Sequence, residues 1–351
     1  MAKGIYDGVG SVARKVTQPY KGVNAVARKV TSGYFGVSGV ARQFYESTPP
    51  LEDCTWAEIS EIAASGKAPN YWAVGDTKSI EVTGQIGEGT GSPTLNDDYL
   101  VYIIGFNHDG ATNTIDFGCF KTTDGTDIAL CSVSYAAVSK KAEGFTMNYG
   151  DGEDYATTTY GGWKGCDLRY GLLGSTDVKP SAYCTSGKRS ASAVGYDATS
   201  TCATSPKAGL NSVMKALPSD LRAVMKPMTI YTENVGGKNS LTMTEDSITT
   251  SIDYLPLLSE FEMFGTTTYS NPYEANYQSQ YEYYANGNSK IKNVVYQHSS
   301  GTTAFGYWLR SPSGATLSSG AATSFCNVSA TGSQDTTVSR YLLSVAPIFR
   351  V

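Results

Sequence analysis

The sequence predicts an α+β protein: one main domain that follows a short repetitive arm. A capped helix leads into apolar, strand-like runs, and the regular alternation of strands and helices that a parallel sheet requires is missing. The chain has 351 residues, 40% of them hydrophobic, which is enough to bury a sizeable core. Its 25 tyrosines and 37 glycines are typical either of a β-rich chain with many turns or of a surface made of recognition loops.

The arm contains one phrase three times, with a period of 14 residues. Six positions are identical in all copies, and in the first copy they are Tyr6, Gly8, Val9, Val12, Ala13 and Arg14. The valines fit either one face of a helix or the alternation of a strand. Gly and Pro between copies leave about ten residues each, too few for a stable isolated helix. We therefore expect short elements that order on a partner, where repeated weak contacts multiply.

Charge is divided unevenly between this arm and the rest of the chain. Seven Lys and Arg against one Asp give residues 1–45 a net charge of +6; since the whole chain carries −5, the remainder carries −11. A basic arm can bind nucleic acid, an anionic membrane or an acidic protein surface. Its basic residues stand at fixed repeat positions between valines and form no aromatic-interleaved stacking platform, so no nucleic-acid partner is expected. The sequence also has neither a membrane-spanning apolar run nor a signal-peptide core, so we expect no membrane insertion and no secretory signal.

The main domain is expected over residues 47–351, with a Thr-Pro-Pro boundary at 48–50. Thr55 and Glu58 form a capping box for a helix that Gly66 ends. A strand is then predicted around 78–84, followed by an apolar run at 99–106 that predicts the central strand.

The rest of the domain is predicted as a loop-rich middle followed by a return to strands. Residues 110–210 have the composition of long loops, which often carry function. A second helix is predicted at 219–225, before Pro227. The last strands are expected around 307–310, 324–328 and 342–351.

Residues that carry chemistry are sparse. The seven cysteines form no CxxC and are expected to be mostly reduced and buried. The only histidines are His108 and His298, which argues against a zinc site and against most His-based catalysis. Asp109 beside His108 could form a dyad, but no nucleophile stands next to it, so we predict a turn there. The acidic stretches 96–98 and 151–154 are predicted as solvated turns and not as Ca²⁺ sites. We therefore expect no enzyme, no metal and no cofactor.

Several phrases occur together and carry a resemblance over roughly residues 54–351. They are Trp56-x-Glu-Ile-Ser60, Gly75-Asp76-x-Lys78, Ile104-Gly-Phe-Asn-His-Asp109, Gly161-Gly-Trp163 followed by Arg169, Ala216-Leu-Pro218, Tyr307-Trp-Leu-Arg-Ser-Pro312 and Val345-Ala-Pro-Ile-Phe349. Together they resemble a domain family of bacterial surface and phage structural proteins. The Trp-Leu-Arg-Ser-Pro phrase is similar to that of C-type-lectin-like folds of the formylglycine-generating-enzyme branch, and the arm is similar to N-terminal segments of phage virion proteins. Formylglycine chemistry needs two cysteines, whereas the C-terminal third holds only Cys326, so that activity is not expected.

The resemblance implies a C-type-lectin-like domain with long loops and a ligand-binding surface near residues 304–338. Trp308 and Arg310 are expected to be structural, as a buried Trp and an Arg paired with a core carboxylate. The polar residues between the fold-defining phrases are the candidates for ligand contact: Thr316, Ser318, Ser319, Thr323 and Ser324.

The sequence and the resemblance together predict a phage virion adhesin. The arm would anchor it to other virion proteins through Tyr6, Arg14, Tyr20, Arg28, Tyr34 and Arg42. The main domain would bind a host surface glycan or protein, and a homo-oligomer is expected, with a trimer as the state that the resemblance implies. The alternatives are a capsid or tail decoration protein that binds no receptor, and an enzyme that acts on envelope glycans.

Overall fold

The protein divides into two compact units, residues 1–53 and 54–351. The division lies a few residues beyond the boundary expected at residue 46. The computed structural model describes these residues: 5–9, 12–16, 19–23, 26–30, 32–38, 40–46, 48–86, 94–131, 145–147, 162–166, 168–176, 211–234, 243–296, 299–313, 324–339 and 341–351.

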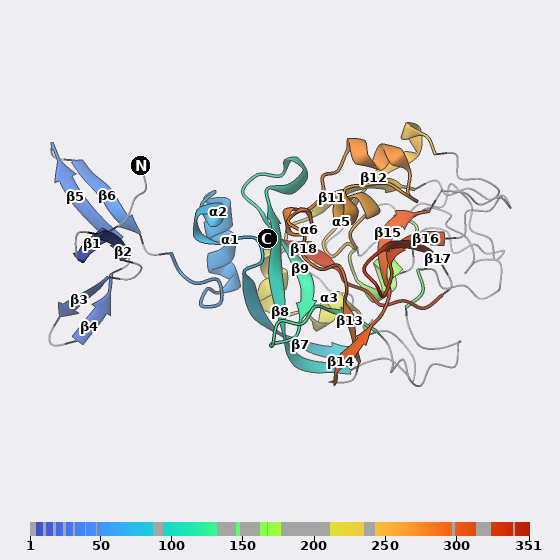
Figure 1. The fold of residues 1–351 in the computed structure, drawn as a ribbon, viewed down its shortest axis with the longest axis horizontal. Helices are drawn as coiled ribbons and strands as arrows, with labels where there is room; N and C mark the ends of the chain where they lie inside the picture. Colours follow the sequence, from blue (N-terminus) through green and yellow to red (C-terminus); the bar gives the residue numbers. More distant parts are fainter. Residues whose placement is uncertain are drawn as a thin grey trace. The chain divides into compact units, whose positions relative to one another are not determined.

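Each copy of the repeat forms one antiparallel hairpin (Figure 1). The strands are β1 (Ile5–Val9) with β2 (Val12–Val16), β3 (Tyr20–Val23) with β4 (Val26–Lys29), and β5 (Ser32–Val37) with β6 (Val40–Glu46). In every copy the glycine is opposite the alanine, and the two valines that flank the turn are opposite each other. These paired valines are three positions apart in the sequence, a spacing that suits a tight hairpin. Of the two patterns that fit the valines, the structure adopts the strand alternation.

The second unit is built around a four-stranded antiparallel sheet with the order β18-β9-β8-β7. Its strands are β7 (Thr77–Gln85), β8 (Thr94–Phe106), β9 (Ile115–Lys121) and β18 (Ile348–Arg350). The strands predicted around 78–84 and 99–106 are confirmed, and β8 lies inside the sheet as expected. The predicted turn at 96–98 is wrong, because these exposed residues continue β8 and pair with β7.

Aromatic side chains cover both faces of this sheet. Helix α1 (Trp56–Ala64) places the Trp56 ring edge-on to Phe117 and Phe349, with ring centroids 5.5 and 5.9 Å apart. On the opposite face, the Tyr281 hydroxyl donates to Asp116 at 2.9 Å. β9 is therefore buried on both sides, although apolar Ile115, Phe117 and Cys119 alternate in its sequence with Asp116 and Gly118. The prediction of loops from residue 110 onward missed this short strand because it rested on the polar composition of the whole region.

The start of α1 confirms the predicted capping box. The Glu58 amide donates to Thr55 Oγ1 at 3.3 Å, and the Thr55 amide donates to Glu58 Oε2 at 2.8 Å. These two bonds satisfy amide groups that have no partner inside the helix. At the other end, Gly66 adopts φ +73°, a left-handed conformation that glycine enters without penalty.

Replacing Thr55 with Ala is expected to lower the free energy of unfolding by about 1 kcal/mol, because the Glu58 amide loses its acceptor. Urea denaturation of the full chain measures the change. Thr55→Ser keeps the oxygen and should remain close to the original protein. An equal loss in both variants would contradict a role for the cap.

The remaining elements of the second unit are short. The helices are α2 (Ala68–Tyr71), α3 (Val213–Ala216), α4 (Ser219–Val224), α5 (Glu260–Phe264) and α6 (Glu282–Ala285). Single helical turns are η1 (His108–Gly110), η3 (Leu168–Leu172), η4 (Glu245–Ser247) and η5 (Pro272–Asn276). The other strands are β10 (Ile128–Leu130), β11 (Met228–Glu233), β12 (Ile248–Asp253), β13 (Asn293–Tyr296), β14 (Ser299–Ala304), β15 (Tyr307–Pro312), β16 (Ser324–Val328) and β17 (Gln334–Val338).

This inventory confirms the α+β class and the predicted helix at 219–225. The strands predicted at 307–310 and 324–328 are β15 and β16, whereas the last predicted strand is regular only over β18. The hairpin of β11 and β12 was not predicted. No helix in the described ranges is long and apolar enough to cross a membrane.

The Trp-Leu-Arg-Ser-Pro phrase lies on β15 and has the structural role expected of it. Trp308 is fully buried, and its indole nitrogen donates to the carbonyl of Phe145 at 2.6 Å. Arg310 is also fully buried, with two bonds of 2.5 and 2.6 Å to the carboxylate of Glu262. A buried Trp and an Arg paired with a core carboxylate are therefore confirmed. The predicted burial of cysteines is likewise confirmed for the five that the structure describes.

Candidate functional site

A pocket of about 310 Å³ lies where the η1 turn, β11, α5 and the end of β18 meet. We call it the His108 pocket. Its volume is at the lower end of the range of small-ligand sites. It is lined by His108, Asp109, Gly110, Ala111, Met228, Thr229, Ile230, Tyr231, Glu262, Tyr281 and Arg350. A second group, around Lys292 and Tyr102, encloses no water-sized space.

The η1 turn presents His108 and Asp109 to this pocket. Asn107 and Asp109 both adopt left-handed backbone angles, with φ of 52° and 50°, a conformation that Asn and Asp tolerate better than most residues. The Asn107 side chain accepts from the Thr114 amide at 3.1 Å, which holds the turn. The predicted turn is therefore confirmed, and it brings two adjacent functional side chains to one wall of the pocket.

The His108 ring is fixed by stacking and not by hydrogen bonds to its Nε2 atom. The ring lies 3.6 Å from the Tyr281 ring, centroid to centroid, at an interplanar angle of 14°. The side chain is only 8% exposed, and Nε2 lies 3.3 Å from Asp109 Oδ2. That contact lacks hydrogen-bond geometry, so the buried Nε2 has no hydrogen-bond partner among the described residues.

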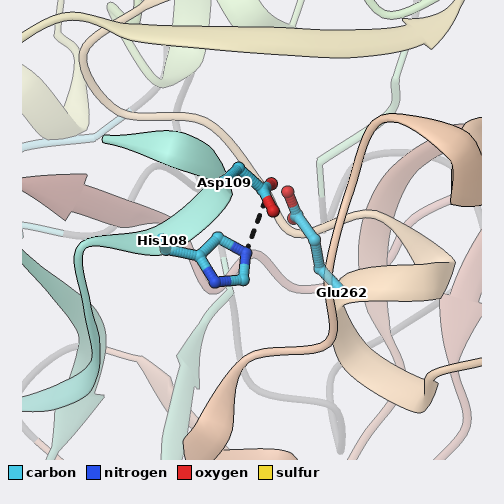
Figure 2. A group of neighbouring side chains, drawn as sticks. All are labelled: His108, Asp109 and Glu262. Carbon is cyan, nitrogen blue, oxygen red and sulfur yellow. Dashed lines mark ion pairs between the residues drawn. The ribbon is translucent and has the colours of Figure 1, made fainter. Parts of the chain in front are cut away.

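Glu262 reaches the same place from α5 (Figure 2). Ser259 and Glu262 form a second capping box, in which the Ser259 amide donates to Glu262 Oε2 at 3.0 Å. Arg310 holds both oxygens of the carboxylate. Figure 2 shows the Asp109 and Glu262 carboxylates facing each other beside the His108 ring. One ligand atom from each of the three residues lies within 4.8 Å of the others.

Arg350, which lines the pocket, forms a largely buried ion pair with Asp116. Arg350 Nε and Nη2 donate to the two oxygens of Asp116 at 2.6 and 2.7 Å, and Nη2 also donates to the His108 carbonyl at 3.2 Å. Burial acts to lower the pKa of Arg350, but the hydrogen bonds and charge of Asp116 outweigh it and raise that pKa. Burial, followed by the charge of Asp116, raises the pKa of Tyr281 well above its usual value. Both groups therefore keep their protons at neutral pH and orient their neighbours.

An aromatic pair stands beside the pocket. Tyr231 lines it and stacks on Tyr277, with ring centroids 5.0 Å apart and an angle of 8°. Tyr277 is 38% exposed and donates from its hydroxyl to Glu245 at 3.0 Å. This bond to a carboxylate raises the pKa of Tyr277. Exposed aromatic area next to a polar pocket suits recognition of an external molecule.

The pocket thus offers one imidazole nitrogen and two carboxylates on one side and apolar β11 side chains on another. Such a site can accept hydrogen bonds from a polar ligand or coordinate a cation. His108, Asp109 and Glu262 are the residues that could hold a metal.

The residues predicted for ligand contact are not those of the pocket. Thr316, Ser318, Ser319 and Thr323 lie outside the described residues. Ser324 begins β16 and is only 8% exposed, and its carbonyl accepts from the Ser313 amide at 2.8 Å. The side chain of Ser324 is therefore packed at a sheet position and is not displayed on a surface loop.

The predicted anchor residues all lie on the hairpins. Tyr20 and Tyr34 are 63% and 58% exposed. The structure gives the cross-strand partners of the other four. Tyr6 is opposite Lys15, Arg14 is opposite Asp7, and Arg28 is opposite Lys21. Arg42 is opposite Phe35.

Sequence reasoning considered the His108–Asp109 pair but missed Glu262, Tyr281 and Arg350. These residues lie far along the chain and meet the η1 turn only through the fold. The Ser-x-x-Glu capping pattern at 259–262 was a local signal for α5, but nothing in it indicated a pocket.

Residues 148–351 match the model of a protein family described as Domain of unknown function (DUF6273). The comparisons with curated proteins and with solved structures gave no match. The matched segment contains Glu262, Tyr281 and Arg350, whereas His108 and Asp109 precede it. The His108 pocket is therefore formed by residues from inside and outside the matched segment.

Proposed function

The chain belongs to the DUF6273 family, and we propose that this member is an attachment protein. In the proposal, the three hairpins anchor it to other proteins of a particle, and the second unit binds a molecule exposed on a host surface. The particle proposed from the resemblance is a phage virion. The observation that carries the proposal is that three copies of one peptide form three hairpins with matching cross-strand partners.

The hairpins have the properties of docking elements. A two-stranded hairpin is marginally stable alone and leaves the outer edge of each strand available for pairing. Adding a strand from a partner to such an edge is a common mode of protein recognition. The exposed Tyr20 and Tyr34 repeat one contact surface, and three equivalent contacts on one chain multiply in affinity. A repeated partner surface, as in a particle with symmetric subunits, would engage all three.

The second unit supplies a site for the host molecule. The His108 pocket combines polar atoms that can accept hydrogen bonds with the aromatic pair Tyr231 and Tyr277. We propose that a host glycan or protein group binds there, and that the loop residues predicted from the sequence add contacts around it.

Deletion of residues 1–46 is expected to abolish retention on particles while the second unit stays folded. Cosedimentation with purified particles measures retention, and thermal unfolding checks the fold. Removing one copy, residues 20–33, should weaken retention by at least tenfold, because the binding energies of linked contacts combine. A scrambled copy of the same composition, at the same position, is the matched control and should be as weak as the deletion.

Two results would refute this division of roles. Normal retention without residues 1–46 would show that the arm is no anchor. Particles that carry the arm without the second unit should fail to adsorb to the host. If they adsorb normally, the protein is a decoration that binds no receptor.

A further inference from the structure

Three side chains of the His108 pocket converge although they come from distant parts of the sequence. His108 and Asp109 come from the η1 turn and Glu262 from α5, and their ligand atoms lie within 4.8 Å of one another. Packing independent of any ligand fixes them: the Tyr281 ring stacks on His108, and Arg310 holds Glu262. The arrangement is therefore built into the fold.

The decisive atom is His108 Nε2. The side chain is more than nine-tenths buried, and Nε2 has no hydrogen-bond partner in the part of the chain that the structure describes. A buried polar atom without a partner is costly to the fold, and a bound ligand removes that cost. Figure 2 shows this atom on the side of the ring that faces the two carboxylates. A neutral imidazole there presents a lone pair to the centre of the group, which is what a metal ion requires.

Each carboxylate also keeps an oxygen with capacity to bind. Asp109 Oδ1 accepts from the Ser279 amide at 2.8 Å, which leaves Oδ2 beside His108. Glu262 Oε2 accepts from Arg310 and from the Ser259 amide, whereas Oε1, among the described residues, accepts only from Arg310 at 2.6 Å. Such outer contacts orient metal ligands in known sites. One ligand atom from each of the three residues thus lies within 4.8 Å of the others.

We propose that His108, Asp109 and Glu262 bind a divalent transition-metal ion of the Zn²⁺ class. An imidazole ligand with carboxylates favours this class, whereas Ca²⁺ and Mg²⁺ prefer sites made of oxygen atoms alone. Arg310 offsets one of the two carboxylate charges, so the site is weaker than a closed structural zinc site. Three protein ligands leave a fourth position open, and all three residues line the His108 pocket. This proposal stands independently of the attachment function.

Isothermal titration calorimetry of the full chain with Zn²⁺ tests the proposal. We expect the chain to bind one equivalent of Zn²⁺. His108→Gln should lower the affinity at least tenfold, and Asp109→Asn by a similar factor. His298→Gln, at the only other histidine, is the matched control and should bind as the original chain does. Co²⁺ gives a second readout, since its visible absorption spectrum reports nitrogen and oxygen ligands directly.

Two outcomes would overturn the proposal. One is Zn²⁺ binding that is unchanged in both His108→Gln and Asp109→Asn. The other is an equally tight Ca²⁺ site that is insensitive to His108→Gln, because a nitrogen ligand would then play no part. Circular dichroism checks that each variant is folded. If His108→Gln is unfolded, Asp109→Asn decides the question, because the Asp109 side chain is partly exposed and its replacement disturbs packing less.

Discussion

Replacing Arg310 with Met is expected to lower the free energy of unfolding by about 3–5 kcal/mol. Arg310 and Glu262 are both buried, and the two bonds between them measure 2.5 and 2.6 Å. Arg310 Nη1 also donates to the Leu257 carbonyl at 2.7 Å. Without the guanidinium, the Glu262 carboxylate stays buried with its main compensating charge gone. Equilibrium denaturation of the full chain in urea measures the loss.

A double-mutant cycle separates the ion pair from general packing. Glu262→Gln keeps the acceptor for the Ser259 amide but removes the charge. The double mutant Arg310→Met/Glu262→Gln should therefore lose less free energy of unfolding than the sum of the losses in the two single mutants. The expected coupling is about 1–3 kcal/mol. If the losses simply add, packing of the Arg310 side chain and not its charge accounts for the effect.

The stability of the protein is expected to fall by about 3 kcal/mol between pH 4.5 and pH 7 because of one carboxyl, that of Glu274. Burial raises the pKa of Glu274 from 4.5 to about 7, and this outweighs hydrogen bonds from Ser311 and the Glu233 amide that act to lower it. Each pKa unit corresponds to 1.36 kcal/mol. Below pH 4.5 the group is protonated in both states. Between the two pKa values the unfolded state releases its proton first and is stabilised.

Glu274→Gln should remove this dependence. The difference in unfolding free energy between the original chain and the variant is expected to change across pH 4.5–7 and to be constant above it. Ser311→Ala is the matched comparison: loss of a hydroxyl that favours the ionised form should extend the fall to higher pH. A difference curve that is flat with pH would show that Glu274 ionises in the fold at its ordinary pKa.

Local signals in the sequence predicted the elements that depend on local chemistry. Thr55 and Glu58 predicted the start of α1, and Gly66 its end, because capping needs particular side chains at fixed positions. The apolar run at 99–106 predicted β8 because a continuous run of apolar, β-prone residues is typical of a buried strand. β9 was missed because Asp116 and Gly118 interrupt its apolar residues and the surrounding region has the composition of loops. The arm was ambiguous because valines three apart fit a helix and valines four apart fit both structures.

The site was less predictable than the fold. His108 and Asp109 are adjacent in sequence and were recognised as a pair. Their partner Glu262 belongs to the capping box of α5, and that role alone accounts for a glutamate at this position. Nothing in the sequence indicates that this carboxylate also points at a histidine. Only the packing of Tyr281 on one side and Arg310 on the other brings the three together.

The pairing of β18 with β9 has a consequence for how this protein can be divided and produced. Arg350 and Asp116, which are opposite each other in these strands, are 234 residues apart in sequence. The family match begins at residue 148, so it omits β7, β8 and β9, the strands beside which β18 folds. A fragment that begins at residue 148 would leave β18 without its partner β9 and would expose the Phe349 ring. We expect this fragment to aggregate. During synthesis, the edge of β9 stays unpaired until β18, at the end of the chain, has been translated. A chaperone that shields this edge would therefore assist folding.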